Sequence, residues 1–175
     1  METFDDIKDQ LRLTQDNRLM LNRVPMIITP VWFFAGIVKR LTEKAGVKLA
    51  SDVLYEAGYQ GAYDWAVVQM QDGLDGRAVM EQYLASMTNR GWGRFEIVSF
   101  ARNRGKGRFR FFNSAIALDH GCTGNRVCHC FSGALAGGFQ AILNSDGAGL
   151  KVNGRETACY SEGGDLCEFE VGPAV

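Results

Sequence analysis

The chain has 175 residues, a net charge of −1 and a hydrophobic fraction of 46%. This length suits one domain with a sizeable core, and the composition excludes wholesale disorder. The near-neutral charge predicts no general attraction to nucleic acid or to an acidic membrane surface.

We expect no targeting signal and no membrane span. Residues 1–6 read Met-Glu-Thr-Phe-Asp-Asp, which lacks the basic start and apolar middle of a signal peptide. The most apolar stretch, residues 24–38, contains two prolines and is too short to cross a bilayer. The five cysteines are an odd number, which argues against a disulfide framework. These features predict a cytoplasmic protein with reduced thiols.

Extended and then helical patterns are predicted in the first half of the chain. Residues 18–28 are β-rich and broken by a proline, which indicates a strand or two short extended pieces. Pro30 stands where a helix can begin, and apolar residues at helical spacing follow as far as Gly46. Further helices are predicted over residues 49–70 and 76–89.

Strand patterns dominate the second half, with one more helix between them. Residues 95–102 alternate in polarity, and a second strand over residues 108–118 would complete an antiparallel hairpin. The basic run 102–110 is interpreted as a solvated hairpin tip, with phosphate or nucleic-acid binding as the lesser alternative. Helical spacing over 127–142 and extended structure over 148–171 follow. The sum is a single α+β domain with helices packed on one antiparallel sheet.

The predicted helix after Cys128 is unusually rich in small residues. Residues 132–138 read Ser-Gly-Ala-Leu-Ala-Gly-Gly, although glycine in a helix interior costs about 1 kcal/mol relative to alanine. Close approach of another backbone or of a ligand is the usual compensation. Tight helix packing is the simpler interpretation, and direct ligand contact is the alternative.

The C-terminal third contains a candidate metal site. Glu156, Cys159 and Cys167 lie within twelve residues, and Cys128 precedes them. Three thiols and one carboxylate are enough to close a tetrahedral zinc site. The polar, turn-forming residues 162–165 would bring the last two thiols to the base of one loop. The alternative is that the cysteines are simply buried as small hydrophobic residues.

Two motifs resemble the 4-vinyl reductase domain family. They are residues 127–137, Val-Cys-His-Cys-Phe-Ser-Gly-Ala-Leu-Ala-Gly, and the tail over residues 156–171. Residues 54–63 are also similar to the glycine-bearing helix of that family. The family includes hydrocarbon-binding proteins and the sensory domains of bacterial activators that respond to aromatic compounds. The resemblance implies one such ligand-binding domain over residues 1–175, with residues 1–48 matching less closely.

The resemblance also implies a bound zinc ion. In the sensory members, a cysteine before the small-residue helix and a glutamate and two cysteines of the tail hold the metal. Carried over to this sequence, the ligands are Cys128, Glu156, Cys159 and Cys167. His129 or Cys130 could replace the first of them. Four protein ligands leave no open coordination position, so the resemblance implies a structural zinc and no catalytic residue.

A ligand cavity between the helices and the sheet is a further implication of the resemblance. Its wall candidates are four aromatic residues: Tyr59, Tyr63, Phe111 and Phe131. A Trp-Glu pair typical of the sensory branch is missing, because residues 115–116 are Ala-Ile. A phenol pocket of that kind is therefore not assumed.

Two classes of function follow from these features. The first is a zinc-stabilised module that binds a small apolar or aromatic molecule and signals through a protein partner or its own homodimer. The alternative is a reductase-type enzyme, or an accessory subunit of an oxidoreductase, as the family name suggests. The sequence has no Gly-x-Gly-x-x-Gly motif, so we expect binding rather than catalysis.

Overall fold

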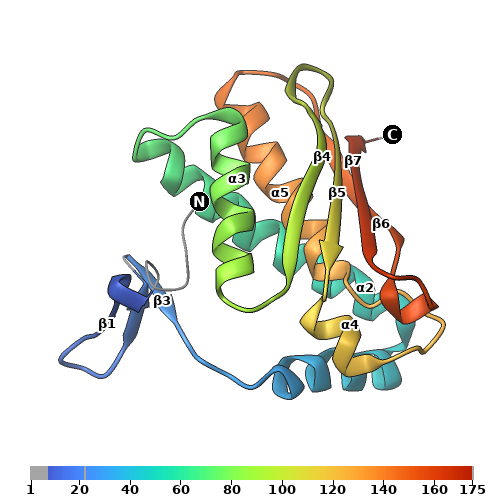
Figure 1. Ribbon diagram of the computed structural model, residues 1–175. Coiled ribbons are helices and arrows are strands. Elements are labelled where there is room, and N and C mark those ends of the chain that lie inside the picture. The colour runs from blue at the N-terminus through green and yellow to red at the C-terminus, as the bar shows by residue number, and fades with distance from the viewer. Residues whose placement is uncertain (1–7, 22, 175) are drawn as a thin grey trace.

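The computed structural model describes residues 8–21 and 23–174 and confirms the α+β class (Figure 1). An N-terminal antiparallel sheet has the order β1-β2-β3, with β1 (Leu11–Leu13), β2 (Leu19–Leu21) and β3 (Val24–Met26). The main antiparallel sheet has the order β4-β5-β7-β6, with β4 (Arg94–Ala101), β5 (Lys106–Phe112), β6 (Val152–Ala158) and β7 (Cys167–Pro173). The helices are α2 (Val31–Gln71), α3 (Gly76–Asn89), α4 (Ala115–His120) and α5 (His129–Ser145).

Helix α5 is the central element of the main body. Residues 131–143 of this helix are buried without interruption, because the main sheet covers one side and α2 the other. On β5, Phe109 and Phe111 point into this core, whereas Arg108 and Arg110 point to solvent. This period of two is the pattern expected of a sheet with one buried face.

Close backbone contact between α2 and α5 explains the small residues of α5. A Cβ atom added to Gly133 would lie 1.9 Å from the Tyr55 carbonyl oxygen, and one on Gly137 would lie 2.0 Å from that of Tyr59. These distances leave no room for any side chain. Tight helix packing therefore accounts for these two glycines.

The predicted helix boundaries around Gly46 also agree with the structure. Secondary structure is continuous from residue 31 to 71, but Gly46 adopts φ 82° and ψ 158°, which kinks α2 at this point. The predicted helix over residues 76–89 coincides with α3. The kink divides α2 into the two helices that the sequence predicts.

The predicted strand over residues 108–118 ends earlier, at Phe112. Asn113 has a positive φ of 54°, which takes the chain out of the sheet. The Ser114 hydroxyl then accepts a hydrogen bond from the backbone N–H of Ala117 at 3.3 Å and caps α4. A short helix therefore replaces the end of the predicted strand.

The β-rich N-terminal segment forms a small sheet at one side of the main body (Figure 1). An extended segment joins β3 to the start of α2. One exposed ion pair joins Arg23 to Asp72, with 3.3 Å between nitrogen and oxygen. Residues 1–6, on which the expectation of no targeting signal rests, lie outside the described residues. Within the described part of the chain, no helix has the length and apolar character needed to cross a membrane.

Candidate functional site

Four side chains from separate parts of the sequence meet at one end of α5. Cys128 is the residue before α5, Glu156 lies on β6, Cys159 follows that strand, and Cys167 begins β7. All four are buried, and one potential ligand atom from each lies within 4.8 Å of the others. The tertiary structure therefore gathers a Cys/Glu/Cys/Cys cluster that could hold a metal ion.

The sulfur separations fit a tetrahedral site. Cys167 Sγ lies 3.8 Å from Cys128 Sγ and 3.7 Å from Cys159 Sγ. A tetrahedron with zinc–sulfur bonds of about 2.3 Å has sulfur–sulfur edges of about 3.8 Å. The same distances are far longer than the roughly 2 Å of a disulfide bond. The thiols are free, and their spacing would suit ligands around a shared ion.

Glu156 supplies the strongest sign that a cation fits this cluster. Its Oε2 accepts a hydrogen bond from the backbone N–H of Cys128 at 3.1 Å. Its Oε1 is buried and has no hydrogen-bond partner among the described residues. A buried carboxylate oxygen without a partner is costly, and a metal ion would satisfy it.

The acidic groups of the cluster resist full ionisation without a positive charge. Burial, followed by the nearby Cys159, raises the pKa of Glu156 to about 9. Hydrogen bonds from the Cys128 and Cys167 thiols lower the pKa of Cys159. The same sharing of protons raises the pKa of Cys128. Four acidic groups this close cannot all ionise in a buried site unless a cation balances them.

Local backbone features orient the side chains of the cluster toward one another. The pairing of β6 with β7 changes register between Glu156 and Ala158, and such bulges redirect side chains. The chain then makes a short 3-10 turn, Tyr160–Glu162, which ends at Gly163 with φ 97°. This turn returns the chain to β7, so Cys159 and Cys167 face each other, as the turn-forming sequence predicts.

The other cysteine and histidine residues considered as metal ligands lie outside the cluster. Cys130 packs against the hydrophobic core, and Cys122 is exposed. Burial lowers the pKa of His129, which belongs to no metal-ligating group among the described residues. The geometry therefore favours Cys128 over His129 or Cys130. His120 Nδ1 lies 3.0 Å from the Ile116 carbonyl oxygen within α4.

The four predicted wall residues fall into two separate pairs. Phe111 and Phe131 have ring centroids 4.7 Å apart and belong to a packed aromatic core. Tyr59 stacks on Tyr63 at 6.4 Å along α2. The Tyr63 hydroxyl accepts a hydrogen bond from the side-chain amide of Asn144 at 3.0 Å. No ring contact joins the two pairs within the described residues, and their role as cavity walls stays a prediction.

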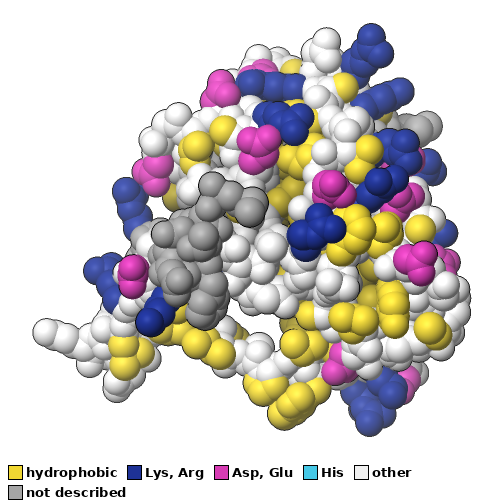
Figure 2. All heavy atoms as spheres, viewed as in Figure 1, with side chains coloured by type: hydrophobic (Ala, Val, Ile, Leu, Met, Phe, Trp, Pro, Cys, Tyr) yellow, Lys and Arg dark blue, Asp and Glu magenta, His cyan; other side chains and the backbone are white. Residues whose placement is uncertain are grey.

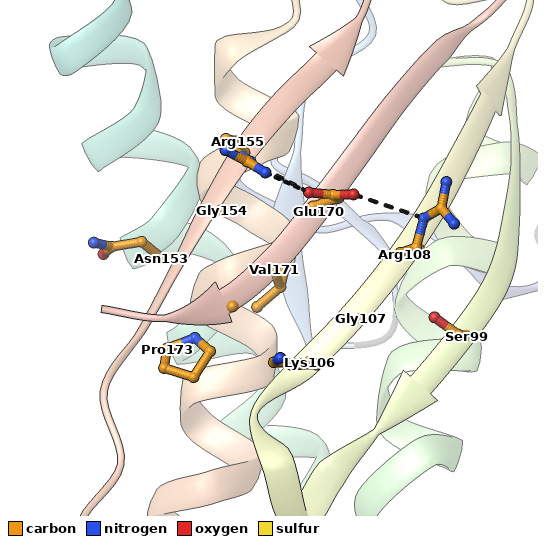
Figure 3. A pocket seen from close by; sticks show the side chains of 11 residues that line it. Ser99, Lys106, Gly107, Arg108, Asn153, Gly154, Arg155, Glu170, Val171 and Pro173 are labelled. Atoms are coloured by element: carbon orange, nitrogen blue, oxygen red, sulfur yellow. Dashed lines mark hydrogen bonds and ion pairs between the residues drawn. The ribbon is translucent and has the colours of Figure 1, made fainter. Parts of the chain in front are cut away.

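Two surface hollows lie elsewhere on the main sheet. A pocket of about 640 Å³ on its outer face contains Glu170, which pairs with Arg155 at 2.7 Å and Arg108 at 3.8 Å (Figure 3). A groove of about 950 Å³ runs between α3 and β4, where Leu84, Phe95 and Ile97 supply apolar surface. The arginines of the outer face thus have partners within the protein, consistent with a solvated face.

Sequence patterns assigned no functional role to Arg90 or to Tyr83. Arg90 follows α3 directly, and its side chain is half-buried between Met87 of that helix and Met26 of β3. Tyr83 lies two turns earlier on the same helix. The signal in the sequence is an arginine between Met87 and Trp92, at the end of a predicted helix. A charged side chain among large apolar residues needs a hydrogen-bond or ion-pair partner.

Solved structures share this fold. The phenol-responsive sensory domain of the transcription activator PoxR aligns over 97% of this chain and 88% of its own, with 19% identity and a TM-score of 0.78. A vinyl-4-reductase family protein from Methanocaldococcus jannaschii aligns over 86% of this chain and 85% of its own, with 18% identity and a TM-score of 0.58. These likenesses confirm the resemblance to the 4-vinyl reductase domain family at the level of the fold.

A more distant likeness joins this fold to a protein with a covalently bound lipid. Subunit 3 of a trafficking protein particle complex from Naegleria fowleri, covalently bound to palmitic acid, aligns over 83% of this chain and 95% of its own. The identity is 12% and the TM-score is 0.55. No curated protein matches the sequence. The profile of a domain of unknown function, DUF5943, matches residues 10–98, about half of the chain, and the chain belongs to this family.

Proposed function

We propose that this protein is a zinc-stabilised module that binds a small hydrophobic or aromatic molecule and passes the signal to a partner. The observation that carries the proposal is the buried Cys/Glu/Cys/Cys cluster within the fold of a phenol-responsive sensory domain. Residues 1–175 would act as one domain. Reduced thiolate ligands suit the cytoplasm, where thiols are kept reduced.

Zinc is the metal that the donor set favours. Three thiolates and one carboxylate are donors that zinc accepts in tetrahedral geometry, and zinc undergoes no redox change at such a site. Cys128, Glu156, Cys159 and Cys167 would fill all four positions, so the ion would join the start of α5 to β6 and β7. Its binding energy would then contribute directly to folding.

A small apolar or aromatic ligand would bind beside this metal centre. The support is the likeness to a domain that responds to phenol, together with the packed aromatic residues around α5. Phe111 and Phe131, or Tyr59 and Tyr63, are proposed as wall residues. The bound ligand would repack these aromatic side chains and so change the shape of the domain.

Signal output would use a second copy of the chain or another protein. Several large apolar residues before and within the first half of α2 are exposed, among them Ile27 (79%), Ile28 (83%) and Trp32 (66%). Figure 2 shows apolar side chains gathered along the bottom of the view, where this segment lies. Exposed apolar residues gathered in one region are typical of a protein–protein interface. We propose that it forms a homodimer.

Two measurements test this function. Elemental analysis of the purified protein should give about one zinc per chain, and native mass spectrometry should reveal a bound or bindable small apolar molecule. A protein with no metal and an unchanged melting curve after treatment with a chelator would contradict the zinc proposal. Failure to bind any apolar or aromatic compound would contradict the sensory proposal.

A reductase-type enzyme or an oxidoreductase subunit is the second candidate. The fold shared with a vinyl-4-reductase family protein favours it. Steady oxidation of reduced nicotinamide or flavin in the presence of a vinyl substrate would favour the enzyme over the binding module. Ligand binding without turnover would instead support the binding module.

A further inference from the structure

Arg90 is a half-buried cation at the C-terminal end of α3. Its Nε donates a hydrogen bond to the Ser86 carbonyl oxygen at 3.0 Å. Its Nη2 lies 2.8 Å from Met87 Sδ, and its Nη1 lies 3.9 Å from Met26 Sδ. No carboxylate among the described residues forms an ion pair with it. Thioether sulfur is a weak acceptor, so most of the five guanidinium N–H groups have no strong partner within residues 8–21 and 23–174.

The end of α3 compensates only part of this charge. Arg90 is the C-cap residue, where the helix dipole is equivalent to about half a negative charge. Its Nε bond to the Ser86 carbonyl is a typical helix-end contact. Burial nevertheless lowers the pKa of Arg90, which means that its surroundings disfavour the charged form. The remaining donors point away from the bonded carbonyl, toward the two sulfur atoms.

Tyr83 provides a second polar group in the same region. The Tyr83 ring centroid lies 5.1 Å from that of Trp65, and the side chain packs against the hydrophobic core. Its hydroxyl forms no hydrogen bond with the described residues, and Arg90 is close enough to act on it electrostatically. Burial raises the pKa of Tyr83 to about 12, yet the side chain keeps some accessible surface. Part of the Tyr83 side chain is therefore accessible to a ligand.

Apolar side chains contact the two groups, and aromatic residues lie close to them in the chain or the fold. Trp92 follows Arg90 by two residues, and its ring makes an edge contact with Phe34 at 5.3 Å. Trp65 covers Tyr83 from α2, and Cys130 of α5 is near enough to interact with it. A ligand that meets a guanidinium and a phenol here would have its remaining atoms among aromatic rings.

We infer that Arg90 and Tyr83 bind the carboxylate of a small aromatic acid. A guanidinium offers two parallel N–H donors that match the two oxygens of a carboxylate, and a neutral phenol adds a third donor. A single cation balances a single negative charge, which fits a carboxylate better than a doubly charged phosphate. The inference rests on the proposed binding function and deepens it by naming the ligand class. Met26 also contacts the guanidinium, so the acid would lie beside the N-terminal sheet.

Calorimetric titration of the metal-loaded full chain with benzoate and benzamide tests this inference. The two probes have the same ring and nearly the same shape, but only benzoate is an anion. The wild-type protein should bind benzoate about 10- to 100-fold more tightly, the range for hydrogen bonds to a charged group. Arg90→Met should remove this preference and leave the affinity for benzamide nearly unchanged.

Further variants separate ligand contact from effects on folding. Arg90→Lys should keep part of the preference, since it keeps the charge without the paired donors, and Tyr83→Phe should weaken benzoate binding while melting normally. Arg77→Met is the matched control, because Arg77 is an exposed arginine on the same helix. If Arg90→Met does not fold, the ratio of benzoate to benzamide affinity in Arg90→Lys and Arg90→Gln decides whether Arg90 binds the carboxylate.

The outcomes distinguish this inference from the proposed function. Equal binding of benzoate and benzamide by the wild-type protein, or an unchanged ratio in the Arg90 variants, would overturn the aromatic-acid site and leave the binding module standing. Binding of neither probe, and of no other aromatic compound, would overturn both.

Discussion

The backbone N–H of Cys128 donates to Glu156 Oε2 at 3.1 Å, while Oε1 of the same carboxylate stays buried without a partner among the described residues. One oxygen is thus held in place by the start of α5, and the other is free to bind an ion between the three thiols. A metal ion bound at Oε1 would compensate the cost of burying this carboxylate.

The first prediction concerns the Glu156 ligand. Glu156→Gln keeps the shape of the side chain but removes its charge, so zinc affinity should fall by at least about tenfold, the lower range for altered groups around metals. Competition with a chromophoric chelator measures this change. Glu170→Gln, on the outer face of the same sheet, is the control and should bind zinc normally. Equal zinc affinity in the two variants would contradict ligation by Glu156.

The second prediction concerns a sulfur ligand and folding. Cys159→Ser should lower the free energy of unfolding by more than about 4 kcal/mol, the range for loss of a structural metal, and should remove cooperative melting. Thermal and urea unfolding followed by circular dichroism measure it. Cys122→Ser changes an exposed thiol outside the cluster and should melt like the wild type. A Cys159→Ser protein that melts normally would mean that the cluster is only packed thiols.

The third prediction is a pH dependence of metal retention. Zinc binding requires thiolates and a carboxylate, so protons compete with the metal and its affinity should decrease as the pH falls. In the presence of a chelator, the stability of the zinc-loaded protein should therefore decrease toward acidic pH. Zinc content measured after equilibration over a pH series checks the sign. Retention that is independent of pH would contradict thiolate ligation.

The fourth prediction compares two neighbouring glycines of α5. Gly137→Ala places a methyl carbon 2.0 Å from the Tyr59 carbonyl oxygen, so it should cost on the order of 3 kcal/mol. Gly138→Ala meets only the end of the Met80 side chain at 3.4 Å. It should be neutral or stabilise the helix by up to about 1 kcal/mol. Chemical denaturation should separate the two variants, and similar stabilities would contradict the close α2–α5 contact.

The fifth prediction tests the exposed apolar surface at the start of α2. Trp32→Glu should shift a dimer toward monomer by about 30-fold in Kd, as expected for loss of a central tryptophan at an interface. Sedimentation velocity over a concentration series measures the shift. Val98→Asp alters an exposed apolar residue on the main sheet and should leave the association unchanged. A wild-type chain that stays monomeric at high concentration would contradict the dimer.

Local sequence patterns determined most of the secondary structure. Helical spacing of apolar residues located α3 and α5, and alternation located β4 and the buried face of β5. The kink at Gly46 was also predictable, since glycine readily adopts positive φ. The early end of β5 was not predictable, because the apolar pattern of a strand continues past Phe112. The positive φ of Asn113 and the helix cap at Ser114 end the strand instead.

By itself, the sequence determined which residue types were available for a metal, through the spacing of Glu156, Cys159 and Cys167. Only the tertiary structure decided that Cys128 rather than Cys130 joins them, because β7 pairs between β5 and β6 and brings distant segments to the start of α5. The same is true of Arg90, which meets two methionine sulfur atoms and no carboxylate of the described residues because of how α3 and β3 pack. Local patterns follow from the chain's own periodicity, whereas a cluster or an unpaired charge is a property of segments that meet only after folding.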